Sequence, residues 1–109
     1  MLHSPPGSCL VAFVSTRGDA AWDAEYAQHA ATLAELIEHQ PGFLAMSSVR
    51  DPVTRHGITL AVFVDEVSAR AWKSVAEHQL AQDFGREHGY ANYRVIITQV
   101  QRSYGPSVT

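Results

Sequence analysis

The chain of 109 residues has little cysteine, no long apolar run and no excess of basic residues. Its single cysteine, Cys9, cannot form an intrachain disulfide or a thiolate metal cluster, so a reduced, cytoplasmic setting is expected. No apolar run approaches the roughly 20 residues of a spanning helix, which argues against a membrane protein. The net charge of −3, with acids and bases interspersed, argues against a nucleic-acid surface.

Several common site motifs are absent too. The six histidines are dispersed and include no helical pair at metal-ligating spacing, so no metal site is predicted. Neither Gly85 nor Gly89 follows a predicted strand, which excludes a phosphate-binding glycine loop. The N-terminal residues 1–7 lack the charged and apolar regions of a signal peptide.

The composition is that of one globular domain. Apolar residues make up 46% of the chain and charged residues 17%, which is too apolar for a disordered protein. A chain of 109 residues can bury a core without disulfides or metals. We therefore expect a single domain over residues 1–109, with an N-terminal arm at 1–7 and a loose tail at 105–109.

Apolar periodicity predicts two helices and four strands. Asp19 is a good N-cap for the first helix, and Pro41-Gly42 ends that helix because the residue before a proline is disfavoured in the α region. A short turn makes the second and third strands an antiparallel hairpin. The expected strands are Ser8–Thr16, Phe43–Arg50, Ile58–Val64 and Tyr93–Tyr104, and the expected helices are Ala20–Gln40 and Glu66–Arg86.

This order of elements predicts a ferredoxin-like α+β fold, in which a four-stranded antiparallel sheet carries both helices on one face. The second face is apolar as well, because Ile58, Leu60 and Val62 alternate with Thr59 and Ala61 in the third strand. A solvated face would carry polar residues, so we expect a homodimer that packs sheet to sheet. The alternative is a monomer whose second face tolerates small apolar groups.

The second helical segment carries two apolar stripes on nearly opposite sides. One stripe includes Val67 and Ala71, and the other includes Trp72. A surface helix needs only one buried stripe, so we expect a break near residues 76–78 that places Trp72 and His78 on opposite walls of a ligand gap. The alternatives are that Trp72 is a core residue and that His78 caps a carbonyl group.

Short motifs spread along the chain resemble those of a known family. They are Gln40-Pro41-Gly42-Phe43-Leu44, Ser48-Val49-Arg50-Asp51, Ala71-Trp72-Lys73, His78 with Ala81-Gln82, Gly85-Arg86, Tyr90 with Tyr93, and Arg102 with Tyr104-Gly105. With these motifs the chain resembles the antibiotic biosynthesis monooxygenase-like proteins of the dimeric α+β barrel superfamily, from Cys9 to Gly105. The resemblance implies a homodimer in which two sheets close a barrel, and a pocket for a small aromatic ligand.

Some members of that family oxidise aromatic compounds with molecular oxygen and no cofactor. The resemblance therefore implies, as first hypothesis, a cofactor-independent monooxygenase acting on a small aromatic or quinol-like compound, with no cofactor and no metal. We expect His78 to take a phenolic proton, Arg86 to stabilise the resulting anion, and Trp72 to hold the substrate. Further substrate-binding residues are expected at Phe13, Phe63, Tyr90 and Tyr93.

Other members bind and degrade haem, with an asparagine on the first strand and a ligating histidine ten residues after the tryptophan. This chain has no asparagine between Ser8 and Thr16 and has Gln82 at the tenth position, and glutamine is a poor haem ligand. The second hypothesis, haem binding with or without degradation, uses His78 or His88. A third hypothesis is a non-catalytic module that binds a small molecule in the same pocket.

Overall fold

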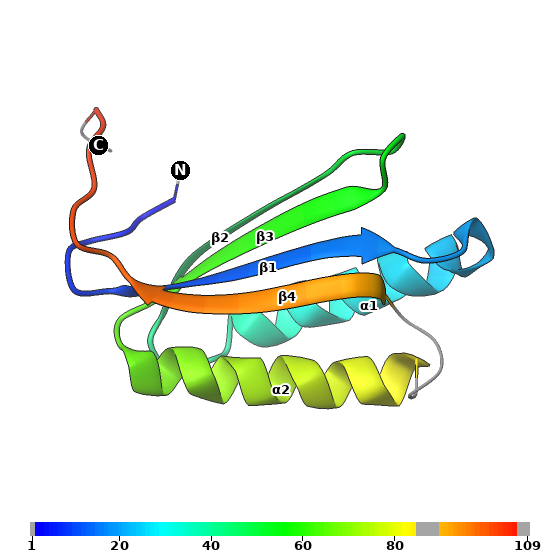
Figure 1. Ribbon diagram of the computed structural model, residues 1–109. Coiled ribbons are helices and arrows are strands. Elements are labelled where there is room, and N and C mark those ends of the chain that lie inside the picture. Colours follow the sequence, from blue (N-terminus) through cyan, green and yellow to red (C-terminus); the bar gives the residue numbers. More distant parts are fainter. Residues whose placement is uncertain (1, 85–89, 107–109) are drawn as a thin grey trace.

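The chain folds in the order strand, helix, strand, strand, helix, strand, with a short 3₁₀ turn before the first long helix (Figure 1). This is a computed structural model, and it describes residues 2–84 and 90–106. The strands are β1 (Cys9–Arg17), β2 (Phe43–Arg50), β3 (His56–Phe63) and β4 (Tyr90–Gln99), and the helical elements are η1 (Ala20–Trp22), α1 (Asp23–Ile37) and α2 (Glu66–Phe84).

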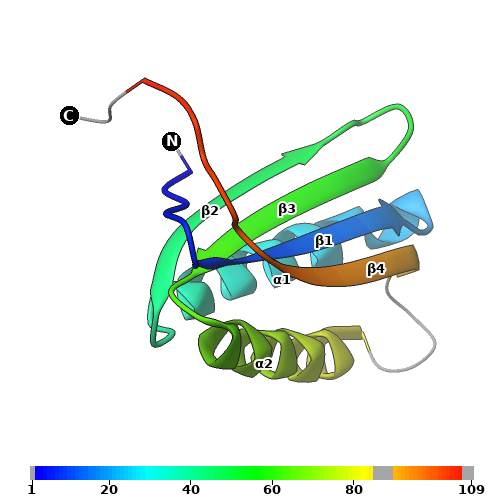
Figure 2. The same ribbon diagram turned by 60° about the vertical axis from the view of Figure 1, so that its left-hand side comes forward.

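The four strands form one antiparallel sheet in the order β2-β3-β1-β4. Both long helices cover one face of this sheet, and the two chain ends rise on the opposite side (Figure 1, Figure 2). The ferredoxin-like α+β fold predicted from the sequence is therefore confirmed. Within the described residues, no helix has the length and apolar character needed to cross a membrane.

Alternate side chains of β1 and β3 face the helices and form the core between the sheet and the helices. Cys9 pairs with Phe63 and Val11 pairs with Ala61, and all four are buried. Trp72 of α2 belongs to the same buried cluster and is 7% exposed. Removing each large apolar side chain from water stabilises the fold by about 1.5–3 kcal/mol.

The face of the sheet away from the helices is apolar and partly open. Val14 and Ile58 are paired neighbours on this face, and they are 40% and 45% exposed. Ile96 of β4 is also 45% exposed. The alternation predicted for the third strand is thus confirmed, because Ile58 and Leu60 lie on this face while Thr59 and Ala61 lie on the helix side.

The first helix begins in two steps and ends early. Asp19 Oδ1 accepts a hydrogen bond from the Ala21 amide at 2.8 Å, so Asp19 caps the 3₁₀ turn and not α1 itself. α1 ends at Ile37 instead of the predicted Gln40, because bonds such as Gln40 N–H to Ile37 O, at 3.0 Å, replace the α-helical pattern. Gly42 completes the reversal with a φ of 77°, which glycine adopts without strain.

The second helix, α2, is continuous from Glu66 to Phe84, so the break expected near residues 76–78 is wrong. One stripe of this helix, which includes Ala69 and Trp72, is buried. Val67 on the other stripe is 78% exposed. Single exposed apolar residues are common on protein surfaces, so the second stripe needs no partner and the helix needs no break.

The ends of two strands also differ from the prediction. β3 begins at His56, and β4 occupies Tyr90–Gln99 instead of Tyr93–Tyr104. The ladder between β1 and β4 stops at the pair Cys9–Gln99, because Cys9 is the first residue of β1. Val100 extends the pairing by two backbone hydrogen bonds, to Gly7 and Ser8, at 2.8 Å each.

Two shifts in strand register turn side chains toward the helices. In β2 the register against β3 shifts just after Phe43, so Phe43 and Arg50 lie on the same face. Strict alternation would place these two residues on opposite faces. In β4 the register against β1 shifts so that Tyr90, and not its neighbour in sequence, pairs with Arg17. Arg50 and Tyr90 are thereby brought to the side of the sheet that Arg17 faces by ordinary alternation along β1.

Candidate active site

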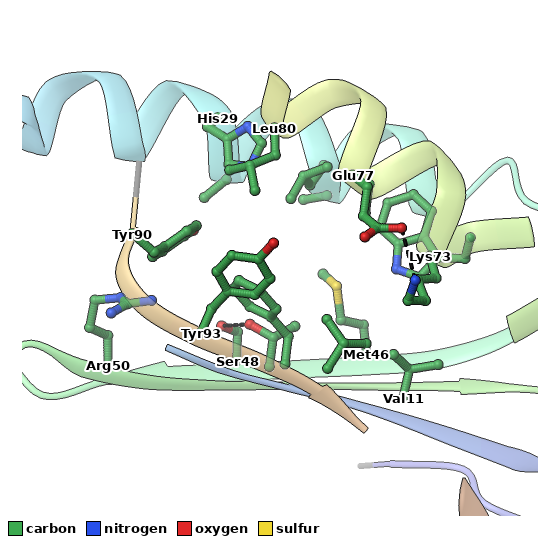
Figure 3. A pocket seen from close by; sticks show the side chains of 18 of the residues that line it. Val11, His29, Met46, Ser48, Arg50, Lys73, Glu77, Leu80, Tyr90 and Tyr93 are labelled. Carbon is green, nitrogen blue, oxygen red and sulfur yellow. Dashed lines mark hydrogen bonds and ion pairs between the residues drawn. The ribbon is translucent and has the colours of Figure 1, made fainter. Parts of the chain in front are cut away.

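A cavity of about 490 Å³ lies between the sheet and the two long helices (Figure 3). Small-molecule sites typically have volumes of about 300–1,000 Å³, so this cavity has the size of a ligand pocket. Its lining is mostly apolar. Arg50 and Tyr90 lie at one end of it, and Lys73 and Glu77 lie at the other (Figure 3).

Aromatic rings form much of the wall. Phe13 comes from β1, Tyr90 and Tyr93 from β4, and Trp72 from α2. The ring centroids of Phe13 and Tyr90 are 5.1 Å apart, and those of Phe13 and Tyr93 are 5.7 Å apart. Rings at these separations stabilise one another and offer flat faces against which a planar ligand can stack.

A histidine held by a carboxylate lies in the helical wall. His29 of α1 lines the cavity and is 2% exposed, and its Nδ1 lies 2.5 Å from Oδ2 of Asp83 on α2. Among the described residues, His29 Nε2 has no hydrogen-bond partner. A carboxylate at Nδ1 favours the tautomer that is protonated there, which leaves Nε2 as the proton acceptor. The His29–Asp83 pair is therefore suited to general base catalysis.

Neighbouring side chains fix this pair in place. Gln79 Nε2 donates to the second carboxylate oxygen of Asp83 at 2.9 Å. The ring of Phe84 packs edge-on against the imidazole of His29, with centroids 5.2 Å apart. Contacts of this kind hold a catalytic side chain in one orientation before a ligand arrives.

Two arginines mark the end of the cavity near Tyr90. Arg17 and Arg50 both line it. Arg50 Nη1 donates to the Arg55 carbonyl oxygen at 2.8 Å, and Arg50 Nη2 donates to Ser15 Oγ at 3.0 Å. Burial lowers the pKa of Arg50, and the charge of Arg17 lowers it further. The guanidinium of Arg50 lies 5.8 Å from the centroid of the Tyr90 ring.

The hydroxyl of Tyr90 is kept protonated by its surroundings. Burial raises the pKa of Tyr90, and the charges of Arg50 and Arg17 offset part of that rise. A tyrosine with a raised pKa remains a neutral phenol near pH 7. Tyr90 is therefore available as a hydrogen-bond donor to a ligand.

The residues predicted from the sequence fall in different places. The structure places four of them on the cavity wall: Phe13, Trp72, Tyr90 and Tyr93. Phe63 is fully buried in the core, where its ring lies 5.9 Å from that of Phe43 between centroids. His78 is exposed on α2 and is not part of the cavity lining. Arg86 and His88 lie outside the described residues.

The sequence predictions missed His29, Asp83, Arg17 and Arg50. His29 carried a usable signal, because it lies three residues after Tyr26 on the buried stripe of the first helix. Its partner could not be found in the same way, because Asp83 lies 54 residues away. Arg50 faces the cavity through the register shift of β2, which sequence alternation does not reveal, whereas Arg17 continues the alternation of Phe13 and Ser15 along β1.

The sequence is similar to a family profile and to a protein of Bacillus subtilis. The profile of the family described as antibiotic biosynthesis monooxygenase matches residues 8–83. The uncharacterized protein YqjZ of Bacillus subtilis is 35% identical over 80 residues, which cover 73% of this chain and 69% of YqjZ.

The solved structures that share the fold at low sequence identity include SnoaB and MhuD. SnoaB, a cofactor-independent oxygenase from Streptomyces nogalater, is 16% identical with a TM-score of 0.58, over 91% of this chain and 97% of that chain. The heme-degrader MhuD from Mycobacterium tuberculosis is 15% identical with a TM-score of 0.60, over 88% of this chain and 99% of that chain. At such identities the similarity concerns the fold alone.

Proposed function

The chain belongs to the antibiotic biosynthesis monooxygenase family, and on that premise we propose that it is a cofactor-independent monooxygenase acting on a small phenolic or quinol-like aromatic compound. The observation that carries this proposal is the His29–Asp83 pair in the wall of an aromatic cavity. The fold that the chain shares with SnoaB, a cofactor-independent oxygenase, supports it by analogy.

The proposed reaction begins when Nε2 of His29 removes the proton of a phenolic hydroxyl group. Asp83 stabilises the imidazolium that forms, because its carboxylate accepts the Nδ1 proton in a hydrogen bond. The phenolate is much richer in electrons than the phenol and reacts with molecular oxygen. An imidazole positioned in this way can accept the proton as a general base.

The atoms and electrons balance without a cofactor. A naphthol that takes up one oxygen atom and loses two hydrogen atoms becomes a naphthoquinone. The second atom of the oxygen molecule leaves with those two hydrogens as water. The substrate supplies all the electrons that reduce oxygen, so this reaction requires no external reductant.

The aromatic wall positions the substrate in this proposal. Trp72, Phe13 and Tyr93 provide the faces on which a planar ring system stacks. Tyr90, as a neutral phenol, donates a hydrogen bond to the oxygen that gains charge. The roles first expected of His78 and Arg86 stay predictions, and we assign the base to His29 because it lines the cavity and His78 does not.

Haem does not fit the described residues in the way expected of the haem-degrading members. Gln82 stands where the resemblance places their ligating histidine, and it is exposed and outside the cavity lining. Among the described histidines, His29 alone lines the cavity, and Asp83 already holds one of its ring nitrogens. Titration with haemin is the check: we expect no Soret shift, and a shift that disappears in His29→Gln would favour haem binding instead.

We also propose that two copies associate through the open face of the sheet. Ile58, Val14 and Ile96 leave a contiguous apolar surface exposed on that face. Apolar surface of this kind usually marks an interface, and a two-fold dimer buries the same patch on both copies. This assembly would pack two sheets face to face, with both cavities on the outer, helical sides.

Oxygen consumption with 2-naphthol and related phenols tests the proposed reaction. We expect His29→Gln to lower kcat by about 100-fold or more, because a positioned general base contributes roughly 10²–10⁴-fold to a rate. His39→Gln, in the exposed turn after α1, is the matched control and should retain full activity. Equal rates for wild type and His29→Gln overturn the assignment, and a loss in His78→Ala alone would return the base to His78.

A further inference from the structure

We propose that Arg17 and Arg50 form a carboxylate-binding subsite at one end of the cavity, so that the substrate is a planar aromatic acid. This inference rests on the proposed function, because it names the class of substrate for the same cavity. It is carried by the way the two guanidinium groups are held and by the lack of acidic partners for them.

Arg50 is held in the cavity by a specific packing arrangement. Its guanidinium lies over Gly57 of the adjacent strand β3, and a Cβ atom at Gly57 would come within 2.4 Å of Arg50 Cζ. Only glycine leaves this space open. The bonds from Nη1 to Arg55 O and from Nη2 to Ser15 Oγ use two of the five N–H donors of Arg50. The remaining donors are free to bind a ligand.

Among the described residues, the side chain of Arg17 has fewer hydrogen-bond partners than that of Arg50. Its guanidinium lies 5.1 Å from the centroid of the Tyr26 ring. Its Nε atom is buried and has no hydrogen-bond partner among the described residues. Buried donors without partners are rare in folded proteins because they destabilise the fold. An anion bound beside Arg17 would supply the missing acceptor.

Nearby acids are engaged elsewhere. Both carboxylate oxygens of Asp23 bind Arg55, at 2.7 and 3.2 Å. Oδ1 of Asp51 accepts hydrogen bonds from the backbone N–H groups of Val53 and Thr54. Within residues 2–84 and 90–106, no acidic side chain forms an ion pair with Arg17 or Arg50. The end of the cavity therefore carries positive charge that a bound anion would neutralise.

A carboxylate on an aromatic ring suits this arrangement better than a detached anion. Guanidinium groups bind planar carboxylates through paired N–H donors. The ring of Tyr90 lies beside Arg50, and Phe13 packs against that ring, so the site favours a ligand whose charge is attached to a flat apolar body. Such a ligand places its acid at Arg17 and Arg50 while its ring system fills the rest of the cavity.

Calorimetric titration under nitrogen tests this subsite without any turnover. The probes are 6-hydroxy-2-naphthoate and its neutral analogue 6-hydroxy-2-naphthamide. We expect wild type to bind the acid at least about tenfold more tightly than the amide, because only the acid carries the charge. This preference should be lost in Arg17→Gln and in Arg50→Gln, while the affinity for the amide changes little.

Two further variants test whether the position of Arg50 matters and whether the charge must lie in the cavity. Gly57→Ala retains both arginines but fills the space over which Arg50 lies, so it should also reduce the preference for the acid. Arg70→Gln removes a charge from the exposed side of α2, where Arg70 is 72% exposed, and should leave the preference intact.

Three outcomes would overturn the subsite. Wild type could bind the acid and the amide equally tightly, or the preference for the acid could survive in both arginine variants. The arginine variants could also lose affinity for the acid and the amide to the same extent, which would indicate a structural role. Equal binding of 6-hydroxy-2-naphthyl phosphate and the naphthoate would overturn the assignment to a carboxylate. Charge-dependent binding without oxygen consumption in air would support the subsite and contradict the monooxygenase, so the two proposals fail separately.

Discussion

Nδ1 of His29 lies 2.5 Å from Oδ2 of Asp83, although 54 residues separate the two in the sequence. The contact joins α1 to α2 across the helical wall of the cavity. One pair of side chains thus links the two helices and holds the imidazole in the wall of the cavity. Removing the carboxylate should therefore affect both catalysis and stability, and the two effects can be measured apart.

Asp83→Asn should lower kcat by about 100-fold or more while KM changes little. The amide can donate to Nδ1, which favours the tautomer with its proton on Nε2 and removes the base. Steady-state oxygen consumption gives kcat and KM. Glu35→Gln, an exposed acid on α1, is the matched control and should behave as wild type. An Asp83→Asn enzyme with unchanged kcat would show that the carboxylate does not orient the base.

Asp83→Ala should destabilise the fold as well. His29 is 2% exposed, so loss of its partner leaves a buried polar group unpaired, at a cost of about 1–3 kcal/mol. Urea denaturation of wild type and variant measures this difference. A change below about 0.5 kcal/mol would mean that water or another group replaces the carboxylate.

Gly42→Ala should destabilise the protein through two separate effects. The φ of Gly42 is 77°, and an added Cβ would lie 2.4 Å from Ser68 Oγ and 2.8 Å from Val64 Cγ2. We expect a loss of about 1–3 kcal/mol in the free energy of unfolding. Gly7 has a φ of 88° with open space around it, so Gly7→Ala isolates the backbone effect. Equal losses in the two variants would show that the clash contributes nothing.

Ile58→Lys should convert a dimer into a monomer. A charge in the middle of an apolar sheet-to-sheet interface is left unpaired when two copies associate. Size-exclusion chromatography with light scattering gives the mass of each form. Val67→Lys, at a position 78% exposed on α2, is the control and should remain dimeric. A monomeric wild type at micromolar concentration would contradict the proposed assembly.

Asp51 should make stability depend on pH in the acidic range. Backbone hydrogen bonds from Thr54 and Val53 lower the pKa of Asp51 in the folded protein. A lowered folded-state pKa means that its contribution is fully present above the unfolded-state pKa, near 4, and is lost as the pH falls through the folded value. The stability difference between wild type and Asp51→Ala should therefore shrink as the pH falls below about 4. A constant difference across that range would contradict this.

The fold could be predicted because its signals are local. The alternation of Ile58, Thr59 and Leu60 predicted which side of the third strand faces the helices, and the structure confirms it. The short turn after Arg50 predicted the hairpin, which is also confirmed. The predicted break in α2 was wrong because Val67 looked like part of a second buried stripe, and it is exposed.

Much of the site could not be predicted, because it depends on contacts between residues distant in the sequence and on shifts of strand register. The apolar periodicity of the sequence encodes neither. The His29–Asp83 pair forms only once α1 and α2 pack on the same sheet. A single extra residue in β2 after Phe43 decides that Arg50 faces the cavity, and no residue type marks that shift. Trp72, by contrast, was found from the sequence because the resemblance pointed to it.

Turnover of a naphthol under ¹⁸O₂ tests directly whether the protein is a cofactor-independent monooxygenase, with the quinone reduced at once to stop exchange with water and then analysed by mass spectrometry. We predict one labelled oxygen atom per product molecule, the other label in water, and about 100-fold less labelled product in the same time with His29→Gln. Product without label, formed alongside hydrogen peroxide, or equal labelling by wild type and His29→Gln, would contradict it.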